Sequence, residues 1–265
     1  MINISFGQII KNIILKNKYL AHSFLYNHPN SKYSIENIID DILFVLKTGI
    51  AWRNIKSQIN WHSLYWHYKR LVKFDIFKKT YMILLKIYSS YSNFNVQIID
   101  SSFIQNKYGK NKIARNKFFK SKNCNKVSLV TDVTGIPISV LIDKGNVHDL
   151  HFIKKHSKDL IIFNNKHKVN HPILLADKAY ESLQVRRNLA DHNYVIYIPK
   201  KKGANNNHPF NKTIYKKRII IEHTFQKLKA FRKIMVRYES LIKNYLGFLY
   251  LAISNIIYNK IIALQ

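Results

Sequence analysis

The feature that most constrains the fold is a change of sequence pattern near Asn95. From Ser34 to about Tyr91 the apolar residues recur at three- and four-residue spacing, which predicts helices. After Asn95, short β-branched runs alternate with helical stretches. This order predicts an α/β domain with a mixed sheet, preceded by a small all-helical N-terminal module.

The expected elements after Asn95 follow the order β-β-β-α-β-α-β-α-α. Strands are predicted at 96–100, as two runs within 126–143 joined by a turn at 132–137, at 171–177 and at 194–200. Helices are predicted at 35–46, 61–74, 77–88, 149–163, 181–189 and 214–233, and from 245 onward. Ser34 is expected to cap the first of these helices, Gly49 to end it, and Asp149 to cap the fourth. A basic, Asn-rich loop is expected at 201–213.

Two domains are therefore expected, a helical module over residues 1–93 and an α/β domain over residues 94–265. The module carries Lys69, Arg70 and Lys73 on its second helix. A helix-turn-helix-like DNA-binding module and an ordinary three-helix subdomain both fit this pattern.

The charge balance points to a polyanionic partner. The chain has 44 Lys and Arg against 14 Asp and Glu, a formal net charge of +30. A coding bias toward AT-rich codons explains abundant Lys but not scarce Asp and Glu. Nucleic acid is the usual partner of such a chain.

The remaining composition favours an intracellular protein with a packed core. Hydrophobic residues make up 47% of the chain, and the single cysteine, Cys124, excludes an internal disulfide. The apolar stretch Tyr245–Tyr258 is shorter than the ~20 residues that a membrane span needs. The N-terminal stretch lacks the pattern of a signal peptide, so no membrane association is expected.

Four aspartates end apolar runs, and two of them have a simple explanation. Asp132 and Asp143 open turn sequences, where Asp is favoured for local backbone hydrogen bonds. Asp100 and Asp177 are not followed by glycine turns. A carboxylate at the end of a buried strand is costly unless a cation lies beside it, and strand ends are where α/β sheets bind ligands.

A third candidate acid, Glu222, lies in a helix that is otherwise apolar and basic. Successive residues of a helix are rotated by ~100°, so four polar side chains fall within roughly 60° of arc on one face. This polar stripe consists of Tyr215, Arg218, Glu222 and Lys229. The adjoining flank holds Ile221, Phe225 and Leu228, which are expected to dock the helix on the sheet. The alternative is a surface ion pair between Arg218 and Glu222, which would not explain the apolar border.

Three carboxylates supply the hard oxygen ligands that Mg²⁺ or Mn²⁺ prefers. Two such ions ~3.5–4 Å apart clamp the attacking and leaving oxygens of a phosphodiester. Asp100, Asp177 and Glu222 are therefore predicted to hold two divalent metal ions. Arg218 and Lys229 would add positive charge beside the phosphate.

The chain resembles the DDE-class bacterial insertion-sequence transposases, specifically the group named after insertion sequence five. The most specific match is the spaced signature Tyr215-x2-Arg218-x3-Glu222-x6-Lys229. The segments 98–109 and 174–182 look like the first- and second-aspartate blocks, and 126–149 like the intervening hairpin. The segments 48–55 and 61–77 are similar to the N-terminal region of that group.

The resemblance implies a ribonuclease-H-like core and a transposase that cuts at the ends of a mobile element. The cut would free a 3′-hydroxyl, which then attacks target DNA. Asp100, Asp177 and Glu222 would be the metal ligands, Arg218 and Lys229 would hold DNA phosphates, and Tyr215 would belong to the same stripe. His148 and Asp149 match a His-Asp pair of the family, although helix capping explains Asp149 nearly as well.

The resemblance also implies double-stranded DNA as partner, through the terminal inverted repeats and the target, and a homodimer assembled on DNA. A cytoplasmic, nucleoid-associated location follows. Three alternatives stay open: an inactive or domesticated DNA-binding relative, a plain nuclease on the same core, and a basic packaging protein. The last would not be expected to bury acids.

Overall fold

The computed structural model describes residues 4–19, 21, 33–199 and 211–265, so most of the predicted loop at 201–213 lies outside the described residues. The chain divides into two compact units, described separately here. The helical unit comprises Met1–Tyr88, Lys107–Asn111 and Leu228–Gln265, and the sheet unit Ser89–Asn106 and Lys112–Lys227. These units differ from the two consecutive segments expected, because the C-terminal helix groups with the N-terminal helices.

The helical unit is built mainly from helices whose apolar faces are buried. Its elements are α1 (Phe6–Leu15), α3 (Ile35–Thr48), the 3-10 helix η1 (Trp52–Asn54), α4 (Trp61–Lys73), α5 (Ile76–Tyr88), α10 (Arg232–Met235), β7 (Val236–Arg237) and α11 (Ile242–Ala263). The Ser34 side chain caps α3 by accepting from the amide of Asn37, and Gly49 ends it at φ +70°, as predicted. A Cβ at Gly49 would lie 2.9 Å from the Cβ of Arg232, so this helix end also needs a glycine for space.

The last helix, α11, is longer than the predicted apolar stretch. Among the described helices it alone is long and apolar enough to cross a membrane by length and composition. It packs against α5, and Phe248, Leu251 and Ile257 are fully buried. A Cβ at Gly247 would lie 2.5 Å from the Val72 side chain, so the helix meets its neighbour closely there. This burial accounts for its apolar sequence.

The sheet unit contains a mixed sheet. Its strands are β1 (Val96–Asn106), β2 (Ala114–Asn116), β3 (Lys122–Thr131), β4 (Pro137–Lys144), β5 (Ile173–Leu175) and β6 (Val195–Tyr197). The core order is β4-β3-β1-β5-β6, in which β4, β3 and β1 pair antiparallel and β1, β5 and β6 pair parallel. The short β2 pairs with the start of β3. The predicted α/β class and the β-β-β-α-β-α-β order of a ribonuclease-H-like core are confirmed.

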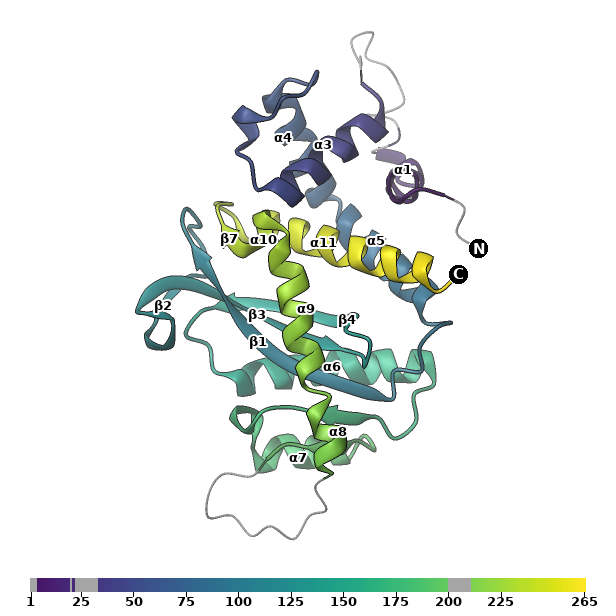
Figure 1. Cartoon of the computed structure of the whole chain (residues 1–265), viewed down its shortest axis with the longest axis vertical. Helices are drawn as coiled ribbons and strands as arrows, with labels where there is room; N and C mark the ends of the chain where they lie inside the picture. Colours follow the sequence, from purple (N-terminus) through teal and green to yellow (C-terminus); the bar gives the residue numbers. More distant parts are fainter. Residues whose placement is uncertain (1–3, 20, 22–32, 200–210) are drawn as a thin grey trace. The chain divides into compact units, whose positions relative to one another are not determined.

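Helices lie on both faces of this sheet. They are η2 (Lys117–Phe119), α6 (Asp149–His167), η3 (Lys178–Tyr180), α7 (Leu183–Ala190), α8 (Lys212–Lys216) and α9 (Ile219–Ala230). In Figure 1, α9 passes in front of β1 and β3, while α6 lies behind them. Because side chains alternate along a strand, neighbouring residues of β1 face different helices.

Two predictions about the helices are wrong. The helix expected at 214–233 is divided into α8, α9 and α10. The amides of Ile220 and Ile221 bond to carbonyls only three residues earlier at the first division, and the amide of Phe231 does so at the second. Asp149 does not cap α6. The cap is His148, whose Nδ1 accepts from the amide of Leu150, and Asp149 is the first helical residue.

Candidate active site

The strand register brings Asp100 and Asp177 together. Strands β1 and β5 run parallel, and their last paired residues are Ile98 and Leu175. Each aspartate lies two residues beyond its paired residue. With a side-chain period of two, both therefore belong to the same face at the point where the parallel strands separate. This separation is the place where α/β sheets bind ligands.

The sequence predicted that Asp100 would be the last residue of its strand, but it is not. Strand β1 continues to Asn106 because the residues after Asp100 keep pairing with β3, from Ser101 opposite Ser128 to Gln105 opposite Cys124. The polar sequence Ser101-Ser102 thus remains in the sheet. Only the parallel pairing with β5 ends before Asp100.

The carboxylate of Asp100 lies among both positive and negative groups. Its Oδ1 accepts from the amide of Ser101 at 2.7 Å, and its Oδ2 lies 3.5 Å from a guanidinium nitrogen of Arg218. Burial raises the pKa of Asp100, and the nearby Asp149 and Asp177 add to this effect, while the Ser101 amide and Arg218 oppose it. A cation at this place is therefore favoured, and in the structure Arg218 supplies it.

Arg218 directly precedes helix α9, which is fixed to the turn between β3 and β4. The predicted docking residues Ile221, Phe225 and Leu228 are all buried. Thr224 is buried as well and donates to the carbonyl of Gly135 at 2.9 Å. Gly135 has φ +84°, and a Cβ there would lie 2.7 Å from the Thr224 hydroxyl. This glycine therefore permits the close approach of α9.

Of the other residues in the predicted stripe, Tyr215 contacts Arg218. The Tyr215 hydroxyl, on α8, accepts from Arg218 at 3.0 Å. Lys229 is half-buried two turns along α9 from Glu222, and burial lowers its pKa. Glu222 is exposed, one turn beyond Arg218. Among the described residues, no three His, Cys, Asp or Glu side chains form a group that could hold a metal ion.

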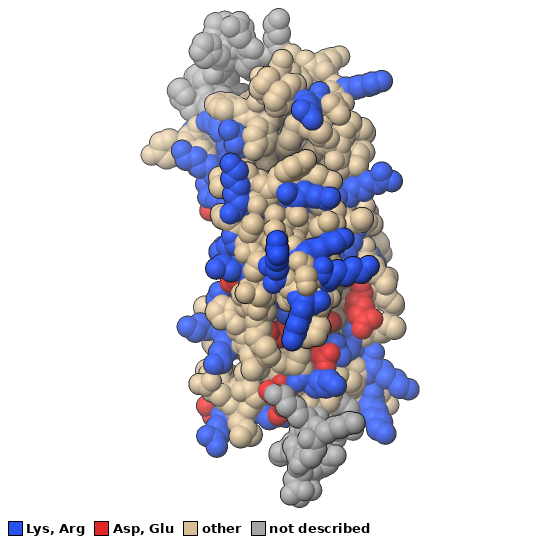
Figure 2. Space-filling model, turned by 90° about the vertical axis from the view of Figure 1, so that its left-hand side faces the viewer, with Lys and Arg blue, Asp and Glu red and all other residues tan. Residues whose placement is uncertain are grey.

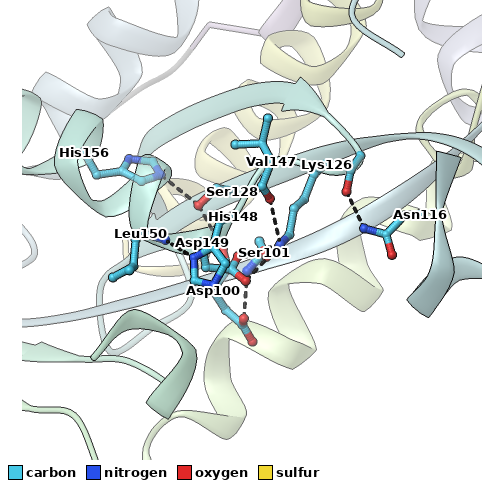
Figure 3. A network of polar contacts seen from close by, with 11 residues as sticks. Asp100, Ser101, Asn116, Lys126, Ser128, Val147, His148, Asp149, Leu150 and His156 are labelled. Atoms are coloured by element: carbon cyan, nitrogen blue, oxygen red, sulfur yellow. Dashed lines mark hydrogen bonds and ion pairs between the residues drawn. The ribbon is translucent and has the colours of Figure 1, made fainter. Parts of the chain in front are cut away.

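A second polar network lies on the opposite face of β1 (Figure 3). The Ser101 hydroxyl donates to Asp149 at 2.7 Å. The ammonium group of Lys126 approaches the same carboxylate at 2.8 Å, and only 8% of the Lys126 side chain is exposed. The sequence had left Asp149 open between a cap and a family residue. The structure makes it the centre of this network, next to Asp100.

Two buried residues, His156 and Tyr180, lie close to this network. His156 on α6 lies between the hydroxyls of Ser139 and Ser128, at 2.8 and 3.0 Å. Tyr180, in the 3-10 helix after Asp177, is 1% exposed, and burial together with Asp149 and Asp100 raises its pKa well above the ordinary value. The sequence did not identify Ser101, Lys126, His156 or Tyr180, because their contacts depend on the pairing of β1 with β3 and on the packing of α6 and η3.

The two turn aspartates behave largely as predicted. Asp132 accepts from the amides of Thr134 and Ile136 at 2.9 Å, within the β3–β4 turn. Asp143 lies near the end of β4, accepts from the amide of Lys144, and pairs with Lys155 at 3.3 Å. Both have structural partners that account for them.

Comparison with known families decides the class of protein. The model of the family described as "Transposase DDE domain" matches residues 92–257, more than half of the chain. The chain belongs to the transposase DDE domain family. The match spans every predicted site residue from Asp100 to Lys229, and it makes the protein a transposase by family rather than a basic packaging protein.

This DDE transposase is also similar to solved transposase structures. The catalytic domain of the Mos1 mariner transposase is 15% identical, with 69% of this chain and 91% of that chain covered and a TM-score of 0.32. A pre-cleavage Mos1 transpososome is 14% identical, with coverages of 97% and 78% and a TM-score of 0.31. The Mos1 mariner paired-end complex with Mn is 15% identical, with coverages of 85% and 70% and a TM-score of 0.32. Curated protein sequences give no match.

The surface of this DDE transposase is strongly basic. Figure 2 shows Lys and Arg distributed over one face of the molecule, with Asp and Glu confined to a few small areas. This distribution agrees with the net charge of +30. The few acids at Asp100, Asp149 and Asp177 therefore lie in a positive field, which attracts phosphate.

Proposed function

We propose that this protein cuts DNA at the ends of a mobile element and joins the freed ends to target DNA. The proposal is supported by one observation above all: Asp100 and Asp177 lie side by side where β1 and β5 separate, inside a transposase DDE domain. The spaced signature from Tyr215 to Lys229 supports the narrower placement in the insertion-sequence-five group. The proposed partners of the protein are the double-stranded terminal repeats and the target DNA. The protein would bind them as a homodimer, in the cytoplasm at the nucleoid.

The donor set at this place suits a hard divalent cation. Asp100 and Asp177 offer carboxylate oxygens, and burial among acids makes the Asp100 charge costly without a cation. We assign these two residues, with Glu222, as ligands of two Mg²⁺ or Mn²⁺ ions. When bound, the two ions activate the attacking oxygen and stabilise the leaving oxygen of the phosphodiester.

The residues of the chain have separate tasks in this reaction. Arg218, which pairs with Asp100 in the structure, can turn its guanidinium to a DNA phosphate once a cation neutralises Asp100. Tyr215 holds that guanidinium through its hydroxyl. Lys229 binds phosphate further along α9. Lys126 and Ser101 fix Asp149, which limits the negative charge that it adds beside Asp100.

The experiment that tests this function uses a labelled donor DNA carrying the element ends, a target plasmid and Mg²⁺. Joined product supports the transposase. Cut but unjoined product supports a plain nuclease, and bound but unchanged DNA supports an inactive DNA-binding relative. The donor ends are found by sequencing DNA beside the gene for short inverted repeats.

A further inference from the structure

A series of polar contacts connects the buried Lys126 to the carboxylate of Asp100. The ammonium of Lys126 lies 2.8 Å from Oδ1 and 2.9 Å from Oδ2 of Asp149. The hydroxyl of Ser101 donates to Asp149 at 2.7 Å, and the amide of Ser101 donates to Oδ1 of Asp100 at 2.7 Å. Lys126, Asp149 and Ser101 thus form a hydrogen-bond relay that ends at Asp100 (Figure 3).

The relay is fixed at its Lys126 end. Only 8% of the Lys126 side chain is exposed. Its ammonium also donates to the carbonyl of Val147 at 3.4 Å and lies 5.4 Å from the centre of the Phe103 ring. Separating Lys126 from Asp149 would leave a charge of each sign unpaired in a largely buried place, which is strongly unfavourable. The pair therefore holds the hydroxyl of Ser101 in one position.

The relay determines which oxygen of Asp100 is available to a cation. Oδ1 is bonded to the amide of Ser101, whereas Oδ2 lies 3.5 Å from the guanidinium of Arg218. The hydroxyl of Ser128 donates to the Asp100 carbonyl at 3.3 Å, and His156 holds that hydroxyl in turn. The backbone and one carboxylate oxygen of Asp100 are therefore fixed, and Oδ2 is left for Arg218 or for a cation.

The loop that carries Asp177 packs beside the same relay. The amide of Tyr180 donates to the carbonyl of Asp177 at 3.0 Å, and the Tyr180 side chain is 1% exposed. Burial raises the pKa of Tyr180, and Asp149 and Asp100 raise it further, so the phenol lies close to both carboxylates. The relay is thus placed beside both elements that carry the strand-borne ligands.

We propose that Asp149 is a positioning residue for metal binding, which acts on Asp100 through Ser101 and is itself held by Lys126. The inference rests on the metal-dependent cleavage proposed above. Because the ammonium of Lys126 compensates its charge, Asp149 acts by holding Ser101 and not by attracting the cation. Groups that hold a ligating carboxylate contribute about 10–100-fold to metal affinity.

The test measures binding of Mn²⁺ to the full-length protein without DNA, by electron paramagnetic resonance of the free ion. Asp100→Asn identifies the part of the binding that depends on Asp100. Ser101→Ala removes the link between Asp149 and Asp100 without changing any charge. It should raise the Mn²⁺ concentration for half-saturation about tenfold. Lys126→Met removes the group that fixes Asp149 and should raise this concentration as well.

Ser157→Ala is the matched control for Ser101→Ala. Ser157 is a buried serine of the same unit, but its hydroxyl donates to the carbonyl of Lys154 within its own helix. This variant should bind Mn²⁺ as the wild-type protein does. Equal weakening by Ser101→Ala and Ser157→Ala would overturn the proposal.

The direction of each effect separates positioning from two simpler roles. If only the charge of Asp149 mattered, Ser101→Ala would have no effect. Lys126→Met would then tighten Mn²⁺ binding, because an uncompensated carboxylate adds negative charge near the cation. If the relay only stabilised the fold, the unfolding temperature would fall while the folded protein kept its Mn²⁺ affinity. Either result would overturn the proposal.

The double variant Lys126→Met/Asp149→Asn guards against a folding defect, because it leaves no unpaired charge and keeps an oxygen acceptor for Ser101. It should recover part of the Mn²⁺ affinity that Lys126→Met loses. No recovery in a double variant that unfolds at the wild-type temperature would contradict the proposal. Absence of Asp100-dependent Mn²⁺ binding by the wild-type protein is a different result, which would contradict the proposed metal site itself.

Discussion

The environment of Asp100 shows why this residue is proposed as a metal ligand. Burial and two neighbouring aspartates raise the pKa of its carboxyl group, whereas the guanidinium of Arg218 lowers that pKa. An arrangement of acids that needs a cation is costly for stability alone. It is reasonable for a site that binds metal ions and then phosphate.

Substitution of the three proposed ligands should separate cleavage from folding. Asp100→Asn, Asp177→Asn and Glu222→Gln should each lower the cleavage rate by more than about 100-fold while DNA binding changes little, because each loses a charged ligand oxygen. The assay is cleavage of labelled element ends in Mg²⁺. Asp159→Asn, at an exposed position of α6, is the matched control and should retain activity. Wild-type cleavage in any one ligand variant would remove that residue from the site.

The Tyr215–Arg218 pair should show graded effects. Tyr215→Phe removes one hydrogen bond of about 0.5–1.5 kcal/mol, so a loss of up to about tenfold in cleavage rate is expected. Arg218→Gln removes the charge and should cost more. Single-turnover cleavage rates measure both. A larger effect of Tyr215→Phe than of Arg218→Gln would contradict the positioning role of Tyr215.

At the scale of elements, the sequence predicted the five strands β1, β3, β4, β5 and β6 and most helices but not where each ends, and it missed the short β2 and β7. Periodicity identified the apolar start of β1, yet Ser101 to Asn106 are mainly polar apart from Phe103 and Ile104, and they stay in the strand because β3 pairs with them. Tertiary pairing of this kind has no local signal. The same holds for the break between α8 and α9, where no proline or glycine marks the change.

The candidate site was predictable where the residue type itself carried the signal. Asp100, Asp177 and Arg218 stood out as charges in apolar surroundings, and the structure places them together. Lys126 and Ser101 did not stand out, because lysine and serine are common in this chain and their burial depends on the fold. Glu222 was predicted from its helix face, and its place as a ligand stays a prediction.

The His156 network between α6 and the sheet predicts a pH dependence of stability. Burial lowers the pKa of His156 to about 3, below its ordinary value of 6.5. The unfolded chain therefore gains a proton near pH 6.5 that the folded chain does not accept until about pH 3. Stability from the neutral histidine is complete above pH 6.5 and falls as pH decreases toward 3, by at most about 1.4 kcal/mol per pH unit.

This effect is measured by comparing unfolding free energies of wild type and His156→Gln from pH 4 to pH 7. Glutamine keeps hydrogen-bonding capacity for Ser128 and Ser139 but does not titrate. The variant should be less stable at pH 7 and should lose less stability on acidification. Parallel pH curves for the two proteins would show that His156 is not the group responsible.

At the scale of the whole molecule, the net charge of +30 should dominate affinity for DNA. Neutralised phosphates release counterions, so the logarithm of the binding constant should fall with the logarithm of salt concentration by about 0.9 for each phosphate contacted. Gel shifts at several salt concentrations measure this slope. Because Lys229 is proposed to contact phosphate, Lys229→Gln should reduce the slope by about one unit. An unchanged slope would contradict that contact.

The central claim is that carboxylate-bound divalent ions carry out DNA cleavage. It is tested most directly by running gel-shift and cleavage reactions side by side in EDTA, Ca²⁺, Mg²⁺ and Mn²⁺. Ca²⁺ accepts the same oxygen ligands but prefers more of them at longer distance. The account predicts binding without cleavage in Ca²⁺, and both binding and cleavage in Mg²⁺ and Mn²⁺. Robust cleavage in EDTA would contradict it, and with it the roles proposed for Asp100, Asp177 and Glu222.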